Sequence, residues 1–319
     1  MTTCLVLGGS GFIGSHVVEL LAAEGFQVRV FSLSANSSNR LAAVADRVEL
    51  RQGDLRDASA LGDAVRGCDY VYHFISTSVP ANSNLHVTSD VETNVISTLR
   101  LLEVCVHEKV RQIIFCSSGG TVYGRSDGKP IPETHPTEPL SSYGITKLAI
   151  EKYLELFRAL YGLDYAILRV ANAYGPRLPI EGQQGVVGIF LESVRKARPI
   201  VVWGDGLVTR DYIYVRDVAK AFRVVLAQQS PFRIFNIGTG IGTSLLGLIN
   251  LIRELTRCRA DVVHKPVRMV HIPVNVLDPN RAREYLDFEP ATCLETGLLE
   301  TWNWLVHEAR TARLTAHIP

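Results

Sequence analysis

The sequence predicts an α/β protein with two domains. The larger is a doubly wound parallel sheet covered by helices, and the smaller is a mixed α/β domain. Three observations support this. Short β-rich runs alternate with longer amphipathic stretches through the first half, and a glycine-rich turn follows the first run directly. After Gly175-Pro176 this alternation gives way to longer loops. Regular β–α alternation predicts a parallel sheet with helices on both faces, because the crossover connections are right-handed.

The predicted elements of the first half are short apolar runs for strands and apolar residues at helical spacing for helices. Strands are expected at residues 4–7, 27–31, 48–51, 70–74, 113–116 and 165–170. Helices are expected between them, at 16–24, 90–107 and 143–161. This order makes the first half one doubly wound domain of the Rossmann type.

The second half combines long loops rich in Gly and Pro with helices, which are expected at residues 186–196, 215–227, 244–256, 279–286 and 293–306. We expect residues 1–170 to form the larger domain and residues 211–237 to return to it. Residues 171–210 and 238–319 then form the smaller domain. Two closely packed lobes make a cleft, and clefts hold small ligands.

The charge and cysteine patterns exclude several classes of protein. The 319 residues carry 33 basic and 32 acidic side chains, and no stretch concentrates one sign, so nucleic acid is not an expected partner. No apolar run approaches the ~20 residues that span a bilayer, so no membrane association is expected. Six cysteines without a C-x-x-C pair indicate buried thiols in a reducing compartment, and we expect a cytoplasmic protein.

The turn GGSGFIG joins the first predicted strand to the first predicted helix. Gly8 permits the tight turn, Gly11 lets the backbone approach a pyrophosphate, and Gly14 lets the helix pack closely on the sheet. The free amides at the helix N-terminus, at Phe12 and Ile13, then hold the phosphates of a dinucleotide. The larger domain is therefore predicted to bind a dinucleotide, and the smaller domain to bind the substrate.

The position that usually selects between NAD and NADP carries Ser32, 18 positions after Gly14, where an acid normally binds the ribose 2′-hydroxyl. Serine donates to a hydroxyl or to a phosphate, and Arg40 nearby suits a 2′-phosphate, so both dinucleotides stay open at this point. Asp54, followed by Leu55, comes just after the third strand. Its carboxylate either reaches the adenine edge or forms a solvated turn.

Tyr143 and Lys147 begin the predicted helix 143–161 and lie one turn apart on one face. An ammonium beside a phenol favours the phenolate, so we expect Lys147 to lower the pKa of Tyr143 toward working pH. Tyr143 is then a general base for a hydroxyl proton while hydride leaves the same carbon. Solvated helix pairs have the same spacing, so the interpretation depends on the neighbouring motifs.

Hydroxyl side chains follow the predicted strand 113–116, at Ser117, Ser118 and Thr121. The carboxyl end of a parallel strand faces the ligand crevice. Ser118 or Thr121 is expected to hydrogen-bond a substrate oxygen and to relay its proton to Tyr143, unless these hydroxyls only cap a turn.

Taken together, these motifs resemble the extended short-chain dehydrogenase/reductases of the nucleotide-sugar epimerase/dehydratase family, which includes the UDP-glucose (UDP-galactose) 4-epimerases. The resemblance runs from Leu5 to about Trp304. Beyond the residues above, it rests on 53–57, Asn94, 122–124, 168–176, 204–206 and 210–215.

The resemblance implies a tightly held NAD, with Tyr143 as the base and Lys147 on the nicotinamide ribose. Further contacts to the dinucleotide are implied at Phe74, Ser76, Asn94 and Ser117. The implied contacts to a nucleotide-sugar substrate, UDP-linked by the same resemblance, are Ser78, Thr121, Asn172, Val187, Arg210 and Arg268. The two arginines suit a diphosphate, because a guanidinium binds phosphate oxygens bidentately.

The chain departs from the family pattern in the serine loop. Gly119 stands where the family has its catalytic Ser or Thr, so Ser118, Thr121 or a water takes that role. Gly119-Gly120 also replaces the Asp-Glu typical of 4,6-dehydratases, and Thr121 replaces the Glu typical of sugar-acid decarboxylases. In the smaller domain, His271 stands where an Asp often follows the phosphate arginine.

Without those carboxylates, the simplest reaction is 4-epimerisation of a nucleotide sugar such as a UDP-hexose, through a transient 4-keto sugar and bound NAD. An NAD(P)-dependent 4-keto reductase or a dehydratase is the alternative, and a non-catalytic dinucleotide-sensing protein is a third hypothesis. In the resembling enzymes, the helices that correspond to 90–107 and 143–161 pair two subunits as a four-helix bundle. We therefore expect a homodimer.

Overall fold

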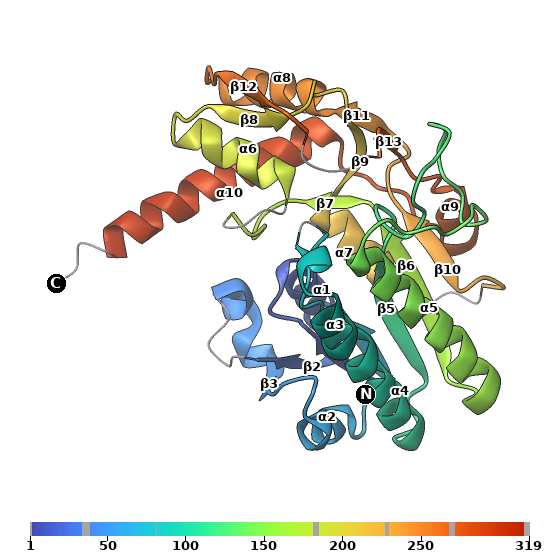
Figure 1. Ribbon diagram of the computed structural model, residues 1–319. Helices are drawn as coiled ribbons and strands as arrows, with labels where there is room; N and C mark the ends of the chain where they lie inside the picture. Colours follow the sequence, from blue (N-terminus) through green and yellow to red (C-terminus); the bar gives the residue numbers. More distant parts are fainter. Residues whose placement is uncertain are drawn as a thin grey trace.

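The computed structural model describes residues 2–33, 39–80, 82–180, 185–226, 230–267 and 272–315. Figure 1 shows a larger lobe, built on one long sheet, and above it a smaller lobe of short strands and helices. Within the described part of the chain, no helix is long and apolar enough to cross a membrane. All six cysteines are free thiols, and Cys4, Cys68 and Cys105 are buried.

The larger lobe is a seven-stranded sheet in which every neighbouring pair of strands is parallel. Its strands are β1 (Thr3–Leu7), β2 (Gln27–Ser32), β3 (Val48–Gln52), β4 (Tyr70–His73), β5 (Gln112–Ser118), β6 (Asp164–Val170) and β10 (Ile234–Ile237). They lie in the order β10-β6-β5-β4-β1-β2-β3. The order reverses between β1 and β4, and open α/β sheets bind ligands beside such a reversal, at the carboxyl ends of the strands. The predicted doubly wound fold is confirmed.

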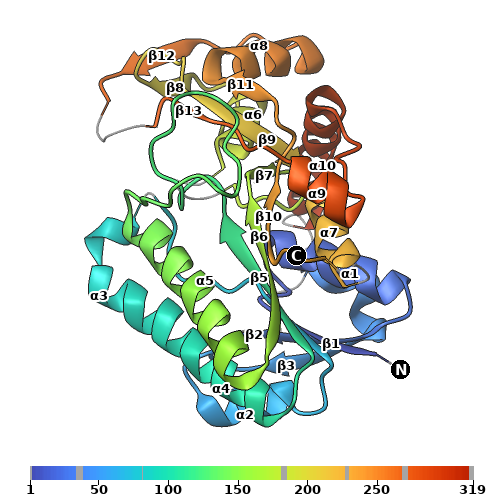
Figure 2. The same ribbon diagram turned by 90° about the vertical axis from the view of Figure 1, so that its right-hand side faces the viewer.

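Helices cover both faces of this sheet, as Figure 2 shows. On β1, Cys4 and Val6 belong to one apolar core, and Leu5 and Leu7 belong to the core on the opposite face. The helices of the first core include α1 (Phe12–Ala23) and α7 (Val215–Val224), and those of the second include α2 (Ala58–Val65), α4 (Ser97–His107) and α5 (Ser142–Tyr161). Strands that are buried on both sides need apolar residues at consecutive positions, which explains the continuous apolar run of β1.

The helix predicted over residues 90–107 begins earlier and changes its winding. Residues Val87–Asp90 form α3, residues Val91–Ile96 form a π-helical turn, and α4 follows. A π turn inserts a residue into a helix, and such insertions occur frequently at functional sites. Asn94 lies in this turn and contacts Thr77, in the segment that follows β4. Apolar periodicity does not reveal an insertion of this kind.

The smaller lobe is organised around β9 (Thr209–Tyr214), which pairs with the short strands β7 (Asn172–Tyr174), β11 (Gly242–Ser244) and β13 (Val274–Asn275). A two-stranded sheet joins β8 (Ile200–Trp203) to β12 (Val262–Lys265). The apolar core of this lobe also includes α6 (Val186–Arg195), α8 (Leu245–Thr256) and α10 (Leu294–Thr315). Most of these strands are too short to carry a periodic signal, so the sequence predicted the helices but not the strands.

The chain crosses between the two lobes several times, so each lobe contains segments that are distant in sequence. Helix α7 packs against α1, and β10 joins the large sheet beside β6. Strand β9 begins at Thr209 and lies in the smaller sheet, although most of it falls in the predicted return segment 211–237. Helix α9 (Asn280–Leu286) falls in the segment predicted for the smaller domain, yet it packs against β10, and its Ala282 lies in a core of the larger lobe. The domain limits drawn from the sequence stay a prediction.

Candidate active site

The glycine-rich turn brings the end of β1, the start of α1 and the segment after β4 into close contact. Gly8 has a φ of +76°, and a Cβ here would lie 3.2 Å from the backbone nitrogen of Ile75. A Cβ on Gly14 would lie 2.4 Å from the carbonyl oxygen of Gly8. Both positions therefore require glycine.

The first turn of α1 leaves its backbone amides without a side-chain cap. The N-cap residue is Gly11, which has no side chain to accept a hydrogen bond. The amides of Phe12 and Ile13 accordingly lie at the positive end of the helix dipole. A cradle of this kind fits the pyrophosphate of a dinucleotide.

Asp54 and Leu55 follow β3, the strand at one edge of the large sheet, and the side chains of both residues have partners within the protein. The Asp54 carboxylate lies 2.5 Å from Nη2 of Arg56, and this hydrogen-bonded pairing keeps the pKa of Asp54 below its usual value. Leu55 is buried in the apolar core beside α2. A contact between Asp54 and an adenine ring stays a prediction.

Ser32 and Arg40 lie near the outer side of the glycine-rich turn. Ser32 ends β2, and its carbonyl accepts a hydrogen bond of 2.9 Å from the amide of Gly53. The guanidinium of Arg40 is half-buried and donates to the carbonyl of Ser10 at 3.3 Å. A cation therefore lies directly against the turn that the dinucleotide phosphates are predicted to occupy.

The segment after β4 presents polar groups toward the crevice and keeps its aromatic ring in the core. The Phe74 ring lies 6.3 Å from that of Tyr72 and 4.7 Å from that of Phe222 on α7. Its side chain therefore packs in the core beneath α7. Ser76 is exposed, and its hydroxyl donates to the carbonyl of Ser78 at 3.1 Å.

Asn94 uses its side chain to hold this segment in place. Its Oδ1 accepts from the amide of Thr77 at 3.0 Å, and its Nδ2 donates to Thr77 Oγ1 at 2.9 Å and to Asp90 Oδ1 at 2.8 Å. The hydroxyl of Ser78 also donates to Asp90, at 2.5 Å. Two predicted ligand-binding residues thus share Asp90, which the sequence analysis missed.

Tyr143 and Lys147 lie in the first turns of α5, which is capped by the side chain of Ser141. The Lys147 ammonium is buried and donates to the carbonyl of Cys116 at 2.9 Å. It lies 5.6 Å from the centroid of the Tyr143 ring. The fold therefore brings the predicted pair together at the carboxyl end of β5.

The pKa of Tyr143 differs from the sequence-based expectation. Burial raises this pKa above its usual value, and the neighbouring Cys116 and Asp90 add to the rise. Burial also lowers the pKa of Lys147. The prediction that Lys147 lowers the pKa of Tyr143 toward working pH is wrong for this chain alone, because burial removes the hydration that stabilises a phenolate.

The serine loop after β5 turns its hydroxyl groups in different directions. Ser118 ends β5 and is half-buried. Thr121 Oγ1 is buried, with no hydrogen-bond partner among the described residues. Ser117 faces the opposite way and donates to Glu151 at 2.5 Å, and Glu151 forms a buried ion pair with Arg169. The structure therefore places Ser117 in a buried network, away from the crevice.

Gly119 has no room for the hydroxyl side chain that its family position normally carries. A Cβ here would lie 2.4 Å from Cδ1 of Leu277 and 3.1 Å from the carbonyl of Arg169. Leu277 is fully buried, so it fills the space next to the loop. Ser118 and Thr121 remain the hydroxyl-bearing residues of this loop.

The predicted substrate residues Asn172 and Arg210 lie on the paired strands β7 and β9, where Asn172 is opposite Tyr212. The amide of Asn172 donates to the carbonyl of Asp211 at 3.0 Å. Nη1 of Arg210 donates to the carbonyls of Thr209 and Ile272 at 2.8 and 2.9 Å. Burial lowers the pKa of Arg210, and this guanidinium forms no ion pair within the described part of the chain.

Asp211 follows this arginine on β9 and is a second residue that the sequence analysis missed. It is fully buried, and its carboxylate accepts from the amides of Thr239 and Gly240 at 2.9 and 3.1 Å. Val187, in contrast, lies with its side chain in the apolar core of the smaller lobe. Arg268 and His271 lie outside the described residues.

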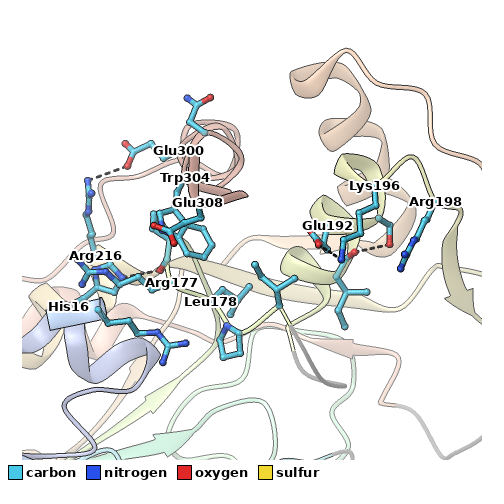
Figure 3. A pocket seen from close by; sticks show the side chains of 17 residues that line it. His16, Arg177, Leu178, Glu192, Lys196, Arg198, Arg216, Glu300, Trp304 and Glu308 are labelled. Atoms are coloured by element: carbon cyan, nitrogen blue, oxygen red, sulfur yellow. Dashed lines mark hydrogen bonds and ion pairs between the residues drawn. The ribbon is translucent and has the colours of Figure 1, made fainter. Parts of the chain in front are cut away.

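A cavity of about 1110 Å³ lies between α1 and the smaller lobe, away from these residues (Figure 3). His16, Arg177 and Trp304 line it, and an ion pair of 3.2 Å joins Arg216 to Glu300 in its wall. Arg40, the predicted partner of a 2′-phosphate, also lines this cavity, but none of the other described residues predicted for catalysis, cofactor or substrate does. Apart from Arg40, which also donates to Ser10 of the glycine-rich turn, the cavity shares no described residue with the predicted site at the turn and α5.

The fold and the site define a dinucleotide-dependent enzyme with a tyrosine–lysine pair, the arrangement of the extended short-chain dehydrogenase/reductases. A family model matches residues 4–238, and the chain belongs to the NAD dependent epimerase/dehydratase family. NAD is the cofactor of this family, and the amide cradle at the start of α1 fits its pyrophosphate.

Named relatives cover almost the whole chain. A UDP-glucose 4-epimerase of Mycolicibacterium smegmatis is 35% identical over 301 residues, which cover 93% of this chain and 96% of that protein. A dTDP-4-dehydro-6-deoxyglucose reductase of Escherichia coli is 30% identical and covers 92% of this chain and 94% of its own. The crystal structure of UDP-glucose 4-epimerase with UDP-glucose from Thermotoga maritima has a TM-score of 0.92 at 36% identity, covering 97% of this chain and 100% of that one.

Replacing Gly14 by alanine is expected to weaken NAD binding by roughly tenfold or more in Kd, because the new Cβ displaces the turn that forms the amide cradle. Isothermal titration of protein stripped of dinucleotide measures this. Gly62→Ala is the matched control, since no atom lies within 4 Å of a Cβ at that helical position. Equal NAD affinity in Gly14→Ala and Gly62→Ala would place the pyrophosphate elsewhere.

Proposed function

We propose that the chain is an NAD-dependent nucleotide-sugar 4-epimerase whose substrate is a UDP-hexose. The observation that carries this proposal is that Tyr143, Lys147 and the amide cradle lie at the carboxyl ends of the strands of one sheet, while the smaller lobe holds the half-buried Arg210. The relatives support the nucleotide sugar and the epimerisation. The proposal requires no net oxidation or reduction.

Tyr143 is the residue proposed to move the proton of the sugar 4-hydroxyl. NAD, when bound, supplies a hydride acceptor with a positively charged ring, and a positive charge favours the phenolate form of a tyrosine. This chain by itself holds the pKa of Tyr143 high, so the base is poorly ionised until that charge is present. Lys147, held by the Cys116 carbonyl, orients the pair. Ser118 or Thr121 passes the proton between the substrate oxygen and Tyr143.

Arg210 and Asn172 are proposed to hold the substrate diphosphate while the sugar turns over. A half-buried guanidinium bonded only to carbonyls retains a net positive charge, which a phosphate neutralises with short, charge-assisted hydrogen bonds. The anchored diphosphate keeps the 4-keto sugar from leaving. Both faces of its carbonyl can then be presented to the same cofactor position.

A 4-keto reductase is the second candidate function, because one relative carries the name of a reductase. The same tyrosine and lysine deliver a proton to a ketone in such a reaction. The two candidates differ in stoichiometry, since a reductase consumes one reduced dinucleotide for each sugar. A 4,6-dehydratase is less well supported, since Gly119 and Gly120 carry no carboxylate.

Incubating the purified protein with UDP-glucose and no added dinucleotide is expected to give the C4 epimer with unchanged mass. Chromatography with mass spectrometry distinguishes the outcomes. A product lighter by one water would indicate dehydration. If the protein converts a 4-keto sugar but not UDP-glucose, and consumes one NADH or NADPH for each sugar, it is a reductase.

Tyr143→Phe is expected to lower kcat by roughly 10²- to 10⁴-fold, the usual contribution of a general base. The NAD content and melting temperature should stay at the wild-type level, because the ring is retained. Tyr161→Phe, on the exposed end of the same helix, serves as the control. Near-normal turnover in Tyr143→Phe would remove Tyr143 from the mechanism.

We propose that the protein is a homodimer that pairs through α5. Ile145, Leu156 and Leu160 lie on one face of this helix and are 54%, 45% and 61% exposed. Val87, on the neighbouring α3, is 52% exposed. Apolar side chains aligned in this way favour a partner helix.

Sedimentation at micromolar concentration is expected to give twice the 35.2 kDa chain mass. Leu160→Glu should shift the protein toward the monomer, because dimerisation would bury the new charge. Leu207→Glu, at a similarly exposed leucine of the smaller lobe, should leave the dimer intact. A wild-type protein that sediments as a monomer would contradict the proposal.

We propose a cytoplasmic location because the six cysteines form no disulfide bond. All six cysteines are free thiols, and free thiols are stable in a reducing compartment.

A further inference from the structure

Asp90 lies where three elements around the catalytic tyrosine meet. Its Oδ1 accepts from Ser78 Oγ at 2.5 Å and from Asn94 Nδ2 at 2.8 Å. Its Oδ2 accepts from Ser142 Oγ at 2.6 Å. Ser78 belongs to the segment after β4, Asn94 to the π-helical turn, and Ser142 directly precedes Tyr143 in α5.

The burial of Asp90 makes these contacts energetically important. The residue is 4% exposed, and within the described part of the chain it has no ion-pair partner. A buried carboxylate outside an ion pair depends strongly on its hydrogen-bond donors, so losing one is costly. Asp90 therefore holds its three donors firmly in place.

The first turn of α5 is held from a second side as well. The amide of Ser142 donates to Asn84 Oδ1 at 2.8 Å, while its hydroxyl donates to Asp90. On the other side of Asp90, Asn94 bonds the amide of Thr77. The start of α5 and the segment after β4 are thus joined through one carboxylate.

We propose that Asp90 is a positioning residue for Tyr143, because its carboxylate clamps the first turn of α5 to the segment that contains Ser78. The inference rests on the proposed role of Tyr143 as the base. The clamp keeps the tyrosine at a constant distance from the nicotinamide side of the crevice, where an error of about 1 Å costs on the order of 100-fold in rate.

The charge of Asp90 gives the clamp an electrostatic consequence. Cys116 and Asp90 both act to raise the pKa of Tyr143, after the larger effect of burial. On Lys147, whose pKa is lowered by burial, Cys116, Glu151 and Asp90 act in the opposite direction. Removing the negative charge of Asp90 therefore lowers the pKa of both groups.

Three variants distinguish the hydrogen-bonding role of Asp90 from the effect of its negative charge. Asp90→Asn removes the charge and disrupts the acceptor pattern. Ser142→Ala removes one hydrogen bond and leaves the charge. Asp217→Asn is the matched control, since Asp217 is a fully buried aspartate on α7 that accepts from the amide of Thr292, far along the chain from this site.

The kinetic readout is the pH profile of kcat, recorded with KM. Asp90→Asn is expected to lower kcat roughly 10- to 100-fold with KM changed less than about threefold, and to move the acid limb about one unit to lower pH. Ser142→Ala should lower kcat and leave the acid limb in place. An Asp90→Asn profile with the wild-type acid limb and wild-type kcat would overturn the proposal.

A second readout does not depend on the reaction. Hydrogen exchange of the amides of Thr77 and Ser142 should be about tenfold faster in Asp90→Asn, because both belong to the clamp. Asp217→Asn should leave these two amides unchanged even if it lowers the melting temperature. Unchanged exchange in Asp90→Asn would overturn the clamp. A wild-type protein that does not epimerise would instead contradict the proposed function, with the exchange result still measurable.

Discussion

The hydrogen bond between the buried Lys147 ammonium and the Cys116 carbonyl is the interaction on which the site depends. It fixes the first turns of α5 against the end of β5. One turn further along the same face, Glu151 forms a buried ion pair with Arg169 of β6, with contacts down to 2.6 Å. Removing one partner of such a pair costs about 3–5 kcal/mol. The helix that carries Tyr143 is thus held to the sheet by two buried charges, each with its own partners.

The smaller lobe shapes the serine loop as well as carrying the proposed substrate residues. Leu277 fills the space beside Gly119, and the Asn275 amide donates to the Gly119 carbonyl at 3.2 Å. The same chain segment meets Asp211, since the amide of Leu277 donates to its carboxylate at 3.4 Å. Asp211 in turn adjoins Arg210. The proposed phosphate arginine and the serine loop are therefore parts of one packed unit, in which a Cβ at position 119 would displace the buried Leu277.

The fold and the main motifs could be predicted from the sequence, because the glycine turn and the β–α rhythm are local signals. Side-chain directions could not. Phe74, Leu55 and Val187 were predicted to contact a ligand, but their side chains pack in or against apolar cores. Asp90 and Asp211 were missed, since their partners are distant in sequence. The direction of the Tyr143 pKa also depends on burial, which a helix pattern does not report.

We propose that Tyr143 serves a reaction in which the hydrogen removed from C4 of the sugar returns to the same carbon. The direct test is to run the reaction on UDP-glucose in D₂O and to examine the product by NMR. The account predicts a C4 epimer with protium retained at C4 and at every other ring carbon. Deuterium at C3 or C5, or a product that has lost water, would contradict it.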